Sequence, residues 1–292
     1  MMPRIVILGS TGMLGSEVER VAKEQRVEHV AISRNTPLSF DARNAQFTQL
    51  AESLDLNEND WVVNCIGWIP QKAVGNAKQD RSDAMMLNAE LPEQISGARD
   101  RYCFNWVQIG TDCVFSGRTG SYSESSAKDA TDLYGQSKIA GEKNSSGALL
   151  IRSSIIGRDQ RTHSGIYSWF KGAVAQGQVD GYSNQMWNGV STTAFARLAI
   201  GISQKGLRSP FEQHWVPRDS VSKYELLTLF AMELGLNKDL VNPVNTSTAL
   251  DKTLVTDNSP RNQELWEIAG YISPPSIQAL CREFIAIDQK LG

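Results

Sequence analysis

The sequence predicts an α/β protein, with a doubly wound parallel sheet in the first half and a smaller, mixed α/β lobe in the second half. Two observations predict this arrangement. In the first half, short runs of apolar residues alternate with segments whose apolar residues recur at helical spacing. Strands that are apolar on both faces are typical of a parallel sheet covered by helices on both sides. After about residue 155 this alternation ends, and helical segments are joined by connections that contain Gly, Pro and Asn.

Strands and helices are expected to alternate through the first half of the chain. The strands are the apolar runs at residues 4–9, 27–33, 60–67, 104–111 and 147–154. The helices between them lie at residues 12–24, 44–54, about 79–100 and 133–142. The first of these helices shows the helical spacing most clearly, because its apolar residues recur at Leu14, Val18, Val21 and Ala22.

The second half is expected to fold mainly into helices, near residues 165–176, 192–203, 221–235 and 275–287. No repeat, low-complexity tract or flexible linker separates it from the first half. We therefore predict that residues 1–157 form the sheet domain and that residues 158–292 form most of the second lobe. We expect the chain to return to the sheet domain around residues 190–205.

The composition is that of a soluble globular protein with ample material for a core, since 41% of the residues are apolar and 21% are charged. The formal net charge is −3 and the 29 basic residues are scattered. This distribution argues against binding to nucleic acid or to an anionic membrane surface. No apolar run approaches the ~20 residues that a membrane-spanning helix needs.

The histidines and cysteines indicate neither a metal site nor disulfide bonds. The histidines are far apart and no two cysteines have CxxC spacing; these residues are His29, His163, His214, Cys65, Cys103, Cys113 and Cys281. The N-terminus enters a strand directly, without the basic segment and cleavage site of a signal peptide. We therefore expect reduced thiols, no bound metal and a cytoplasmic location.

The loop after the first strand carries glycines at the spacing G-x-x-G-x-x-G and opens a helix. A glycine permits the tight turn, another lets backbone N–H groups approach a pyrophosphate, and the last lets the helix pack closely. The phosphates then lie at the positive helix N-terminus. We therefore predict a Rossmann-type dinucleotide-binding domain, whose contacts in this loop are Gly9, Thr11, Gly12, Met13, Leu14 and Gly15.

The end of the second strand indicates which dinucleotide is bound. An Asp or Glu there would hold the ribose hydroxyls of NAD, whereas an Arg suits the 2′-phosphate of NADP. The chain has Ser33 and Arg34 at this point and no carboxylate, which favours NADPH, with NADH possible. Asp41 is expected near the adenine. The remaining predicted cofactor contacts are Cys65, Ile66, Gly67 and Asn88, together with Tyr134 and Lys138.

The chain contains the pattern Tyr-x-x-x-Lys twice, as Tyr134 to Lys138 and as Tyr167 to Lys171. Residues four apart lie on one face of a helix, so both pairs place a phenol beside an ammonium group. Thr111 ends a predicted strand 23 residues before Tyr134, whereas Tyr167 has the fifth predicted strand between it and Thr111 and lacks this context. With Thr111, Tyr134 and Lys138 in this order, the chain resembles the extended short-chain dehydrogenase/reductase family. The second pair is expected on a packing helix.

The resemblance implies that Thr111, Tyr134 and Lys138 are catalytic, and side-chain chemistry explains why these types are needed. A ketone that accepts hydride becomes an alkoxide and needs a proton, which a tyrosine can donate. A lysine one turn away favours the phenolate and is expected to lower the tyrosine pKa from about 10. The threonine hydroxyl would hold the carbonyl oxygen. The hydride itself comes from the cofactor.

Within that family the chain is most similar to the dTDP-4-dehydrorhamnose reductase branch, which reduces the 4-keto group of nucleotide-linked 6-deoxysugars. The matching segments are GSTGMLG (9–15), VVNCIG (62–67), LNAELP (87–92), TDCVFSG (111–117), LYGQSKIAGE (133–142), LLIRSSIIG (149–157), SKYELL (222–227) and DKTLVTDNS (251–259). The resemblance implies an NADPH-dependent oxidoreductase in the biosynthesis of cell-surface polysaccharides.

Single residues weigh against some sister activities, and others stay open. Dehydratases of the family carry Asp-Glu after the catalytic Thr, whereas this chain has Asp112-Cys113. An epimerase, and a non-catalytic NADP-binding subunit like the regulatory subunit of methionine adenosyltransferase, remain alternatives. The segments NQMWNGVSTTAFA (184–196) and THSGIYSWF (162–170) depart from the reductases, so the sugar and the nucleotide stay open.

The expected partner is a nucleotide-sugar substrate, bound between the sheet domain and the second lobe, and a homodimer is compatible with the sequence. Nucleic acid and membrane are not expected as partners. The predicted substrate contacts are Trp68, Asp112, Arg158, Trp187 and Asn188.

Overall fold

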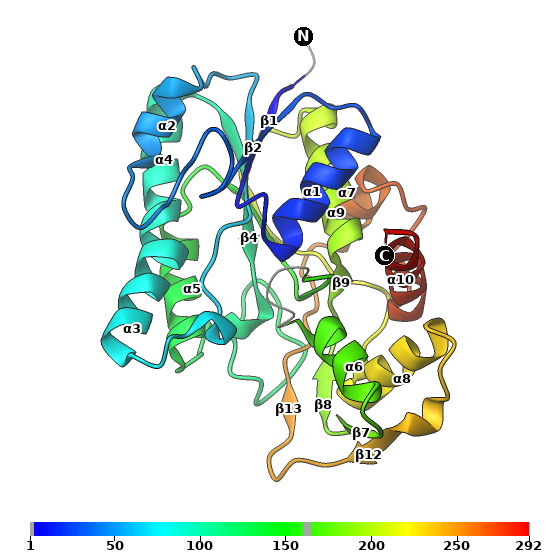
Figure 1. Ribbon diagram of the computed structural model, residues 1–292. Helices are drawn as coiled ribbons and strands as arrows, with labels where there is room; N and C mark the ends of the chain where they lie inside the picture. The colour runs from blue at the N-terminus through cyan, green and yellow to red at the C-terminus, as the bar shows by residue number, and fades with distance from the viewer. Residues whose placement is uncertain (1–2, 160–164, 292) are drawn as a thin grey trace.

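The structure, a computed structural model, describes residues 3–159 and 165–291. Its centre is a six-stranded sheet in the order β10-β5-β4-β3-β1-β2 (Figure 1). Every pairing between neighbouring strands of this sheet is parallel. The strands are β1 (Ile5–Leu8), β2 (His29–Ile32), β3 (Trp61–Asn64), β4 (Asn105–Gly110), β5 (Leu149–Arg152) and β10 (Phe211–His214). The predicted doubly wound parallel sheet is confirmed, and β10 extends it with a strand from the second half of the chain.

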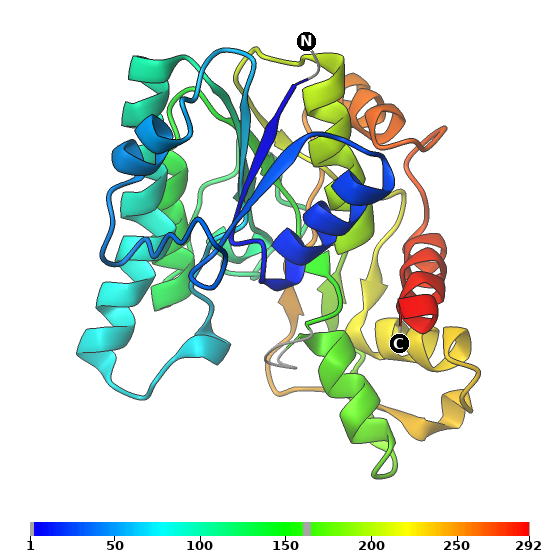
Figure 2. The ribbon, with the colours of Figure 1, turned by 45° about the horizontal axis from the view of Figure 1, so that its top comes forward.

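Helices cover both faces of this sheet (Figures 1 and 2). One face carries α1 (Met13–Glu24), α7 (Thr192–Lys205) and α9 (Ser259–Ile268). The other carries α2 (Phe47–Ser53), α3 (Ala77–Met85), α4 (Leu91–Tyr102) and α5 (Leu133–Lys143). Successive side chains of a strand point to opposite faces, so each strand supplies two cores. In β1, Ile5 and Ile7 join the core on the α1 side, and Val6 and Leu8 join the core on the α4 side.

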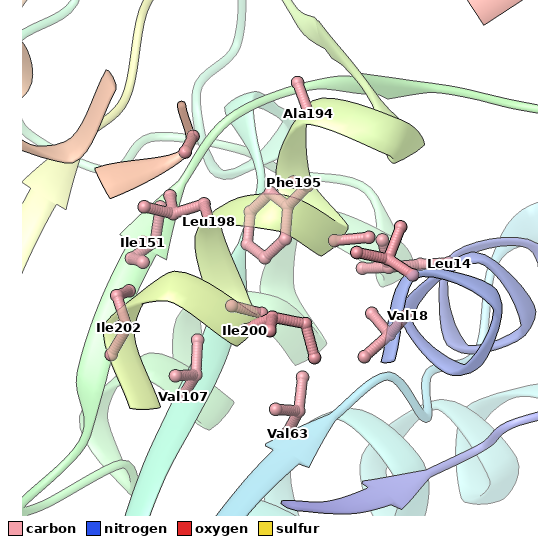
Figure 3. Close-up of a cluster of buried hydrophobic side chains, with 14 of the residues drawn as sticks. Leu14, Val18, Val63, Val107, Ile151, Ala194, Phe195, Leu198, Ile200 and Ile202 are labelled. Atoms are coloured by element: carbon pink, nitrogen blue, oxygen red, sulfur yellow. The ribbon is translucent and has the colours of Figure 1, made fainter. Parts of the chain in front are cut away.

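The core on the α1 side brings together segments that are far apart in the sequence (Figure 3). Leu14 and Val18 of α1 lie beside Ile200 of α7, over Val63 of β3. Nearly every residue of α7 from Thr192 to Ser203 is buried, because this helix lies between α1, α9 and the sheet. The second half of the chain therefore returns to the sheet domain through α7, β10 and α9.

The second lobe has its own core and three small sheets. It contains α6 (Ile166–Val174), β7 (Val179–Tyr182), β8 (Gln185–Trp187), β11 (Val221–Ser222), α8 (Lys223–Glu233), β12 (Val241–Val244), β13 (Leu250–Asp251) and α10 (Ile277–Leu291). The small sheets pair β11-β8-β13, β12-β7 and β6-β9, where β6 is Ile155–Ile156 and β9 is Val190–Ser191. The boundary at residue 157 stays a prediction. The second half contributes α7, β10 and α9 to the sheet domain, and β6 of the first half pairs with β9 of the second.

The long helix expected at 79–100 is interrupted. The chain forms α3, then a π-helical turn over Met86–Glu90, and then α4 with Pro92 in its first turn. Proline has no backbone N–H and cannot donate the helical hydrogen bond, which explains why α4 starts there. The π turn holds Asn88, which belongs to the site below, and such turns are frequent at functional sites.

Within the described ranges 3–159 and 165–291, no helix combines the length and apolarity required to cross a bilayer. The same residues contain no group of three or more His, Cys, Asp or Glu side chains placed to hold a metal ion. All four cysteines are free thiols.

Candidate active site

The glycine loop between β1 and α1 is shaped by close backbone contacts. Gly9 has φ +79°, a conformation that L side chains rarely adopt. A Cβ on Gly15 would lie 2.2 Å from the carbonyl oxygen of Gly9, so only glycine lets α1 start this close to the loop. Gly12 precedes α1, and its N–H donates to the Gly9 carbonyl at 2.9 Å. The loop from Gly9 to Gly15 thus forms a cradle of bare backbone, which side chains in place of its glycines would fill.

This cradle fits the phosphates of a dinucleotide. No side chain in the described part of the chain caps α1, so the N–H groups of its first turn are open to an anion. Thr11 is exposed at the loop and Met13 is partly exposed. Leu14 can contribute only its backbone, because its side chain is buried in the core beside Val18 (Figure 3).

Two arginines lie between β2 and α2: Arg34 close to the end of β2, as predicted, and Arg43 further along, which was not predicted. Ser33 is buried and its hydroxyl accepts from the Asn35 N–H at 3.1 Å, while Arg34 is exposed. Arg43 donates to both oxygens of Asp41, at 3.0 and 2.7 Å. The Arg43 guanidinium holds the pKa of the Asp41 carboxyl below its ordinary value, with a smaller contribution from Arg34. Asp41 is thus bound to Arg43. Because Arg43 is only two residues from Asp41, this spacing was the sequence signal for the pair.

The segment after β3 lies directly against the glycine loop. The closest heavy atom to a Cβ placed on Gly9 would be Cγ1 of Ile66, at 3.0 Å, followed by the backbone of Cys65. The Ile66 N–H donates to the side chain of Asn64 at 3.1 Å, which fixes the turn. Burial raises the pKa of the Cys65 thiol, so it stays protonated. The predicted contacts at the ends of β1 and β3 are therefore neighbours, as the change of strand order at β1 requires.

Asn88 joins three segments of the site through its buried side-chain amide. Its Oδ1 accepts from the Trp68 N–H at 2.9 Å, and its Nδ2 donates to the Trp68 carbonyl at 3.0 Å and to Ser137 Oγ at 2.9 Å. A Cβ on Gly141 would lie 1.8 Å from the Asn88 carbonyl oxygen, so the π turn touches α5. These bonds give Asn88 a structural role that holds α5 and the Trp68 segment together.

Thr111, Tyr134 and Lys138 converge at the carboxyl end of β4. Asp132 caps α5 by accepting from the Gly135 N–H at 2.9 Å, and so sets where Tyr134 enters the helix. The side chains of Thr111 and Tyr134 lie close to one another. Lys138 lies one turn further along α5, and its Nζ donates to the Ile109 carbonyl at 3.0 Å. The three side chains that the sequence singled out are thus brought together by β4 and α5.

The protonation of this group differs from the expectation. Burial raises the pKa of Tyr134, and the neighbouring Thr111 hydroxyl only partly opposes it. Burial also lowers the pKa of Lys138, against the attraction of Glu142. The prediction that Lys138 brings the pKa of Tyr134 down is wrong for this structure, because burial and the negative charges of Asp112 and Asp132 both raise it. Tyr134 is held as a protonated phenol, which suits a proton donor.

A buried cluster of charges behind Lys138 was not identified from the sequence. Arg152 is fully buried and donates to both oxygens of Glu142, at 3.1 and 2.6 Å, and to Glu212 at 2.7 Å. It also bonds Nε2 of His214, whose Nδ1 lies 2.8 Å from the Val255 carbonyl. Burial and the Arg152 cation lower the pKa of His214. The available signal in the sequence was that Glu142 follows Lys138 by four residues, the spacing that places two side chains on one face of a helix.

The predicted substrate contacts differ in their burial and in their bonding partners. Asp112 is buried beside Thr111 and accepts from the Thr111 hydroxyl at 3.1 Å. Trp68 is 4% exposed, and its Nε1 has no hydrogen-bond partner among the described residues. Arg158 is ion-paired with Asp288 at 3.4 Å.

The two contacts predicted on and after β8 have structural partners. Trp187 is buried and donates from Nε1 to Ser154 Oγ at 2.7 Å. Asn188 exchanges two hydrogen bonds with the backbone of Leu254, at 2.7 and 2.8 Å. Their side chains therefore hold β8 against the neighbouring segments. His163 and residues 162–164 of the departing segment lie outside the described residues.

Comparisons with known proteins show which family and which solved fold this chain is similar to. The family model described as RmlD substrate binding domain matches residues 2–289. A dTDP-4-dehydrorhamnose reductase of Mycobacterium tuberculosis is 23% identical over 277 residues, which cover 91% of this chain and 87% of that protein. The methionine adenosyltransferase 2 subunit beta of Bos taurus is 22% identical over 282 residues, which cover 90% of this chain and 80% of that protein.

A crystal structure of dTDP-4-dehydrorhamnose reductase from Bacillus anthracis, in complex with NADP, has the same fold. Its TM-score is 0.79 at 19% sequence identity, and the match covers 98% of this chain and 100% of that chain. The fold predicted from the sequence is therefore shared over the whole length of a solved reductase.

Proposed function

This chain belongs to the RmlD substrate binding domain family, and we propose that it is an NADPH-dependent reductase of the 4-keto group of a nucleotide-linked 6-deoxysugar. Its product would enter the biosynthesis of cell-surface polysaccharides. One observation carries the proposal: Thr111, Tyr134 and Lys138 meet at the end of β4, with the Tyr134 phenol close to Thr111 and Lys138 held by the Ile109 carbonyl. The curated relatives named dTDP-4-dehydrorhamnose reductase support the choice of substrate class.

The cofactor would lie across the carboxyl ends of β1 and β3. The glycine loop and the start of α1 would hold its pyrophosphate, and Arg34 with Arg43 would face its 2′-phosphate. When bound, NADPH supplies the hydride. Thr111 would hold the substrate carbonyl oxygen by a hydrogen bond, and Tyr134 would donate the proton from its phenol. Lys138 would keep Tyr134 in place and donate to the nicotinamide ribose.

The protonation state of the Cys113 thiol distinguishes a reductase from a dehydratase. Burial, with the nearby Asp112 charge, raises the pKa of the Cys113 thiol to about 12. The thiol is therefore neutral at pH 7 and is a poor replacement for the Glu that dehydratases carry at this position. This observation favours the reductase.

The proposal is tested by incubating the protein with NADPH and a panel of dTDP- and UDP-linked 4-keto-6-deoxysugars, following the loss of nicotinamide absorbance. We expect turnover of at least one of these sugars. Turnover without net NADPH loss, with an epimerised sugar in the product, would instead establish an epimerase. Normal NADPH binding with no turnover across the panel would favour the alternative of a non-catalytic NADP-binding subunit.

The cofactor preference is tested by Arg34→Ala and Arg43→Ala. Each arginine would face a phosphate that NADH lacks, so we expect each variant to weaken NADPH binding roughly tenfold or more while NADH binding changes little. Titration of the intrinsic fluorescence with each nucleotide measures both affinities. Equal loss for the two nucleotides would remove the specificity argument.

A further inference from the structure

Lys223 is an unusual lysine at the start of α8. Its Nζ lies 5.2 Å from the centre of the Trp187 ring, and the side chain is partly buried. Among residues 3–159 and 165–291, no hydrogen bond or ion pair of this ammonium group is found. The charge therefore has an aromatic neighbour but no anionic partner within bonding distance.

Three features make this position unfavourable for a cation. Burial lowers the pKa of Lys223, because the charged form loses water. The residue opens α8, where the helix dipole is positive and repels an ammonium group. A partner that would offset both effects is missing from the described part of the chain. Polar groups held at a cost to stability are characteristic of binding sites.

Lys223 faces the catalytic loop from the second lobe. Its charge interacts with Asp112 and Cys113, which follow the catalytic Thr111. The sheet β11-β8-β13 sets this geometry, because Lys223 directly follows β11 while β8 carries Trp187.

A second lysine, Lys252, directly follows β13 on the other side of β8. Its Cγ would lie 2.9 Å from a Cβ on Gly117, and its charge also acts on Cys113. Since the Cys113 thiol is neutral at pH 7, Asp112 is the negative charge that acts on Lys223, and Lys252 adds a second positive charge near Cys113. The excess of positive charge suits an anion.

We propose that Lys223, with Lys252, forms a cationic subsite that binds a phosphate group of the nucleotide-sugar substrate, opposite the catalytic Thr111 and Tyr134. This inference rests on the proposed function, since it concerns the substrate of the same site. A phosphate supplies the missing partner of Lys223 and places the sugar between the second lobe and α5.

The test compares binding of dTDP and UDP with binding of thymidine and uridine, which lack the phosphates. Isothermal titration calorimetry is run on the wild-type chain, Lys223→Met, Lys223→Arg and Lys252→Met, with Lys238→Met as the control at an exposed lysine. We expect Lys223→Met to weaken nucleoside diphosphate binding about tenfold or more. We expect Lys252→Met to weaken it less, and Lys223→Arg and Lys238→Met to stay within about threefold of wild type.

Nucleoside and NADPH binding should be unchanged in all variants, which also shows that the variants are folded. Because Lys223 is unfavourable in the free protein, Lys223→Met should raise the melting temperature by about 1–3 °C. Equal diphosphate affinity of the wild type and Lys223→Met would overturn the subsite alone. If the wild type binds NADPH but neither dTDP nor UDP, the proposed substrate class fails, and the subsite fails with it.

Discussion

The two Tyr-x-x-x-Lys pairs show how one local pattern acquires two different roles. On α5, the Tyr134 phenol lies close to Thr111, and Lys138 reaches the backbone at the end of β4. On α6, Tyr167 is fully buried and donates to Asp288 of α10 at 2.8 Å, and Lys171 donates to the same carboxylate at 3.0 Å. A phenol beside a hydroxyl at a sheet end stays available for chemistry, whereas a phenol bound to a carboxylate in a core serves packing.

The surroundings of the two tyrosines reinforce this difference. Tyr167 packs edge-on against Phe230 and Phe284, within the core of the second lobe. Burial and the Asp288 carboxylate raise the pKa of Tyr167 far above its ordinary value, so it stays protonated. The expectation of a packing helix at this position is confirmed. Tyr134, in contrast, keeps part of its surface open.

The largest expected difference between the pairs is in turnover. Tyr134→Phe removes the proposed proton donor and should lower kcat by about 10²–10⁴-fold with unchanged NADPH affinity. Tyr167→Phe should keep near wild-type kcat and lose about 1 kcal/mol of unfolding free energy, from its bond to Asp288. Steady-state kinetics and denaturant unfolding of both variants measure this. Full turnover by Tyr134→Phe would show that the catalytic assignment is wrong.

The second contrast is between one glycine in each helix. A Cβ on Gly141 of α5 would lie 1.8 Å from the Asn88 carbonyl oxygen, and a Cβ on Gly172 of α6 would have no neighbour within 4 Å. Gly141→Ala must push α5 away from the π turn and should cost about 2–4 kcal/mol of unfolding free energy. Gly172→Ala should be neutral or stabilising by up to about 1 kcal/mol.

Thermal unfolding of the two glycine variants decides this prediction. NADPH titration of Gly141→Ala under conditions where it is folded then reports whether the site itself has moved. The close packing of α5 would be refuted by equal melting temperatures of the two variants.

The smallest contrast concerns pH, because the region behind α5 contains a buried histidine. The pKa of His214 is lowered in the folded state, so below its ordinary value of about 6.5 the unfolded chain binds a proton that the folded chain does not. The stability that neutral His214 contributes is present above pH 6.5 and is lost as the pH falls. We expect a loss of about 1 kcal/mol between pH 7 and pH 5 from this residue.

Denaturant unfolding at the two pH values measures the effect of His214. His214→Gln, which can still accept from Arg152, should show less acid loss than the wild type. His29→Gln is the matched control, because His29 lies at the start of β2, away from this cluster. An identical acid loss in wild type and His214→Gln would contradict the prediction.

Local signals explain which parts of the site were predictable. The glycine loop could be read from the sequence because a turn, a helix start and close backbone approach each restrict the residue type within a few positions. Thr111, Tyr134 and Lys138 were identified by order and spacing. Arg43 was missed although its partner Asp41 lies only two residues away. Lys223 was missed because nothing in its neighbourhood of the sequence shows which partners it meets.

The sequence by itself determined the alternation of buried strands and helices and the glycine loop between β1 and α1, and it predicted Thr111, Tyr134 and Lys138 as the catalytic residues. The alternation and the loop depend on contacts between residues close together in the chain. Only the tertiary structure decided that Asn88 and Asn188 hold backbone segments together and that Trp187 is buried beside Ser154. It also decided that burial raises the pKa of Tyr134, because burial is the sum of contacts from segments far apart in the sequence.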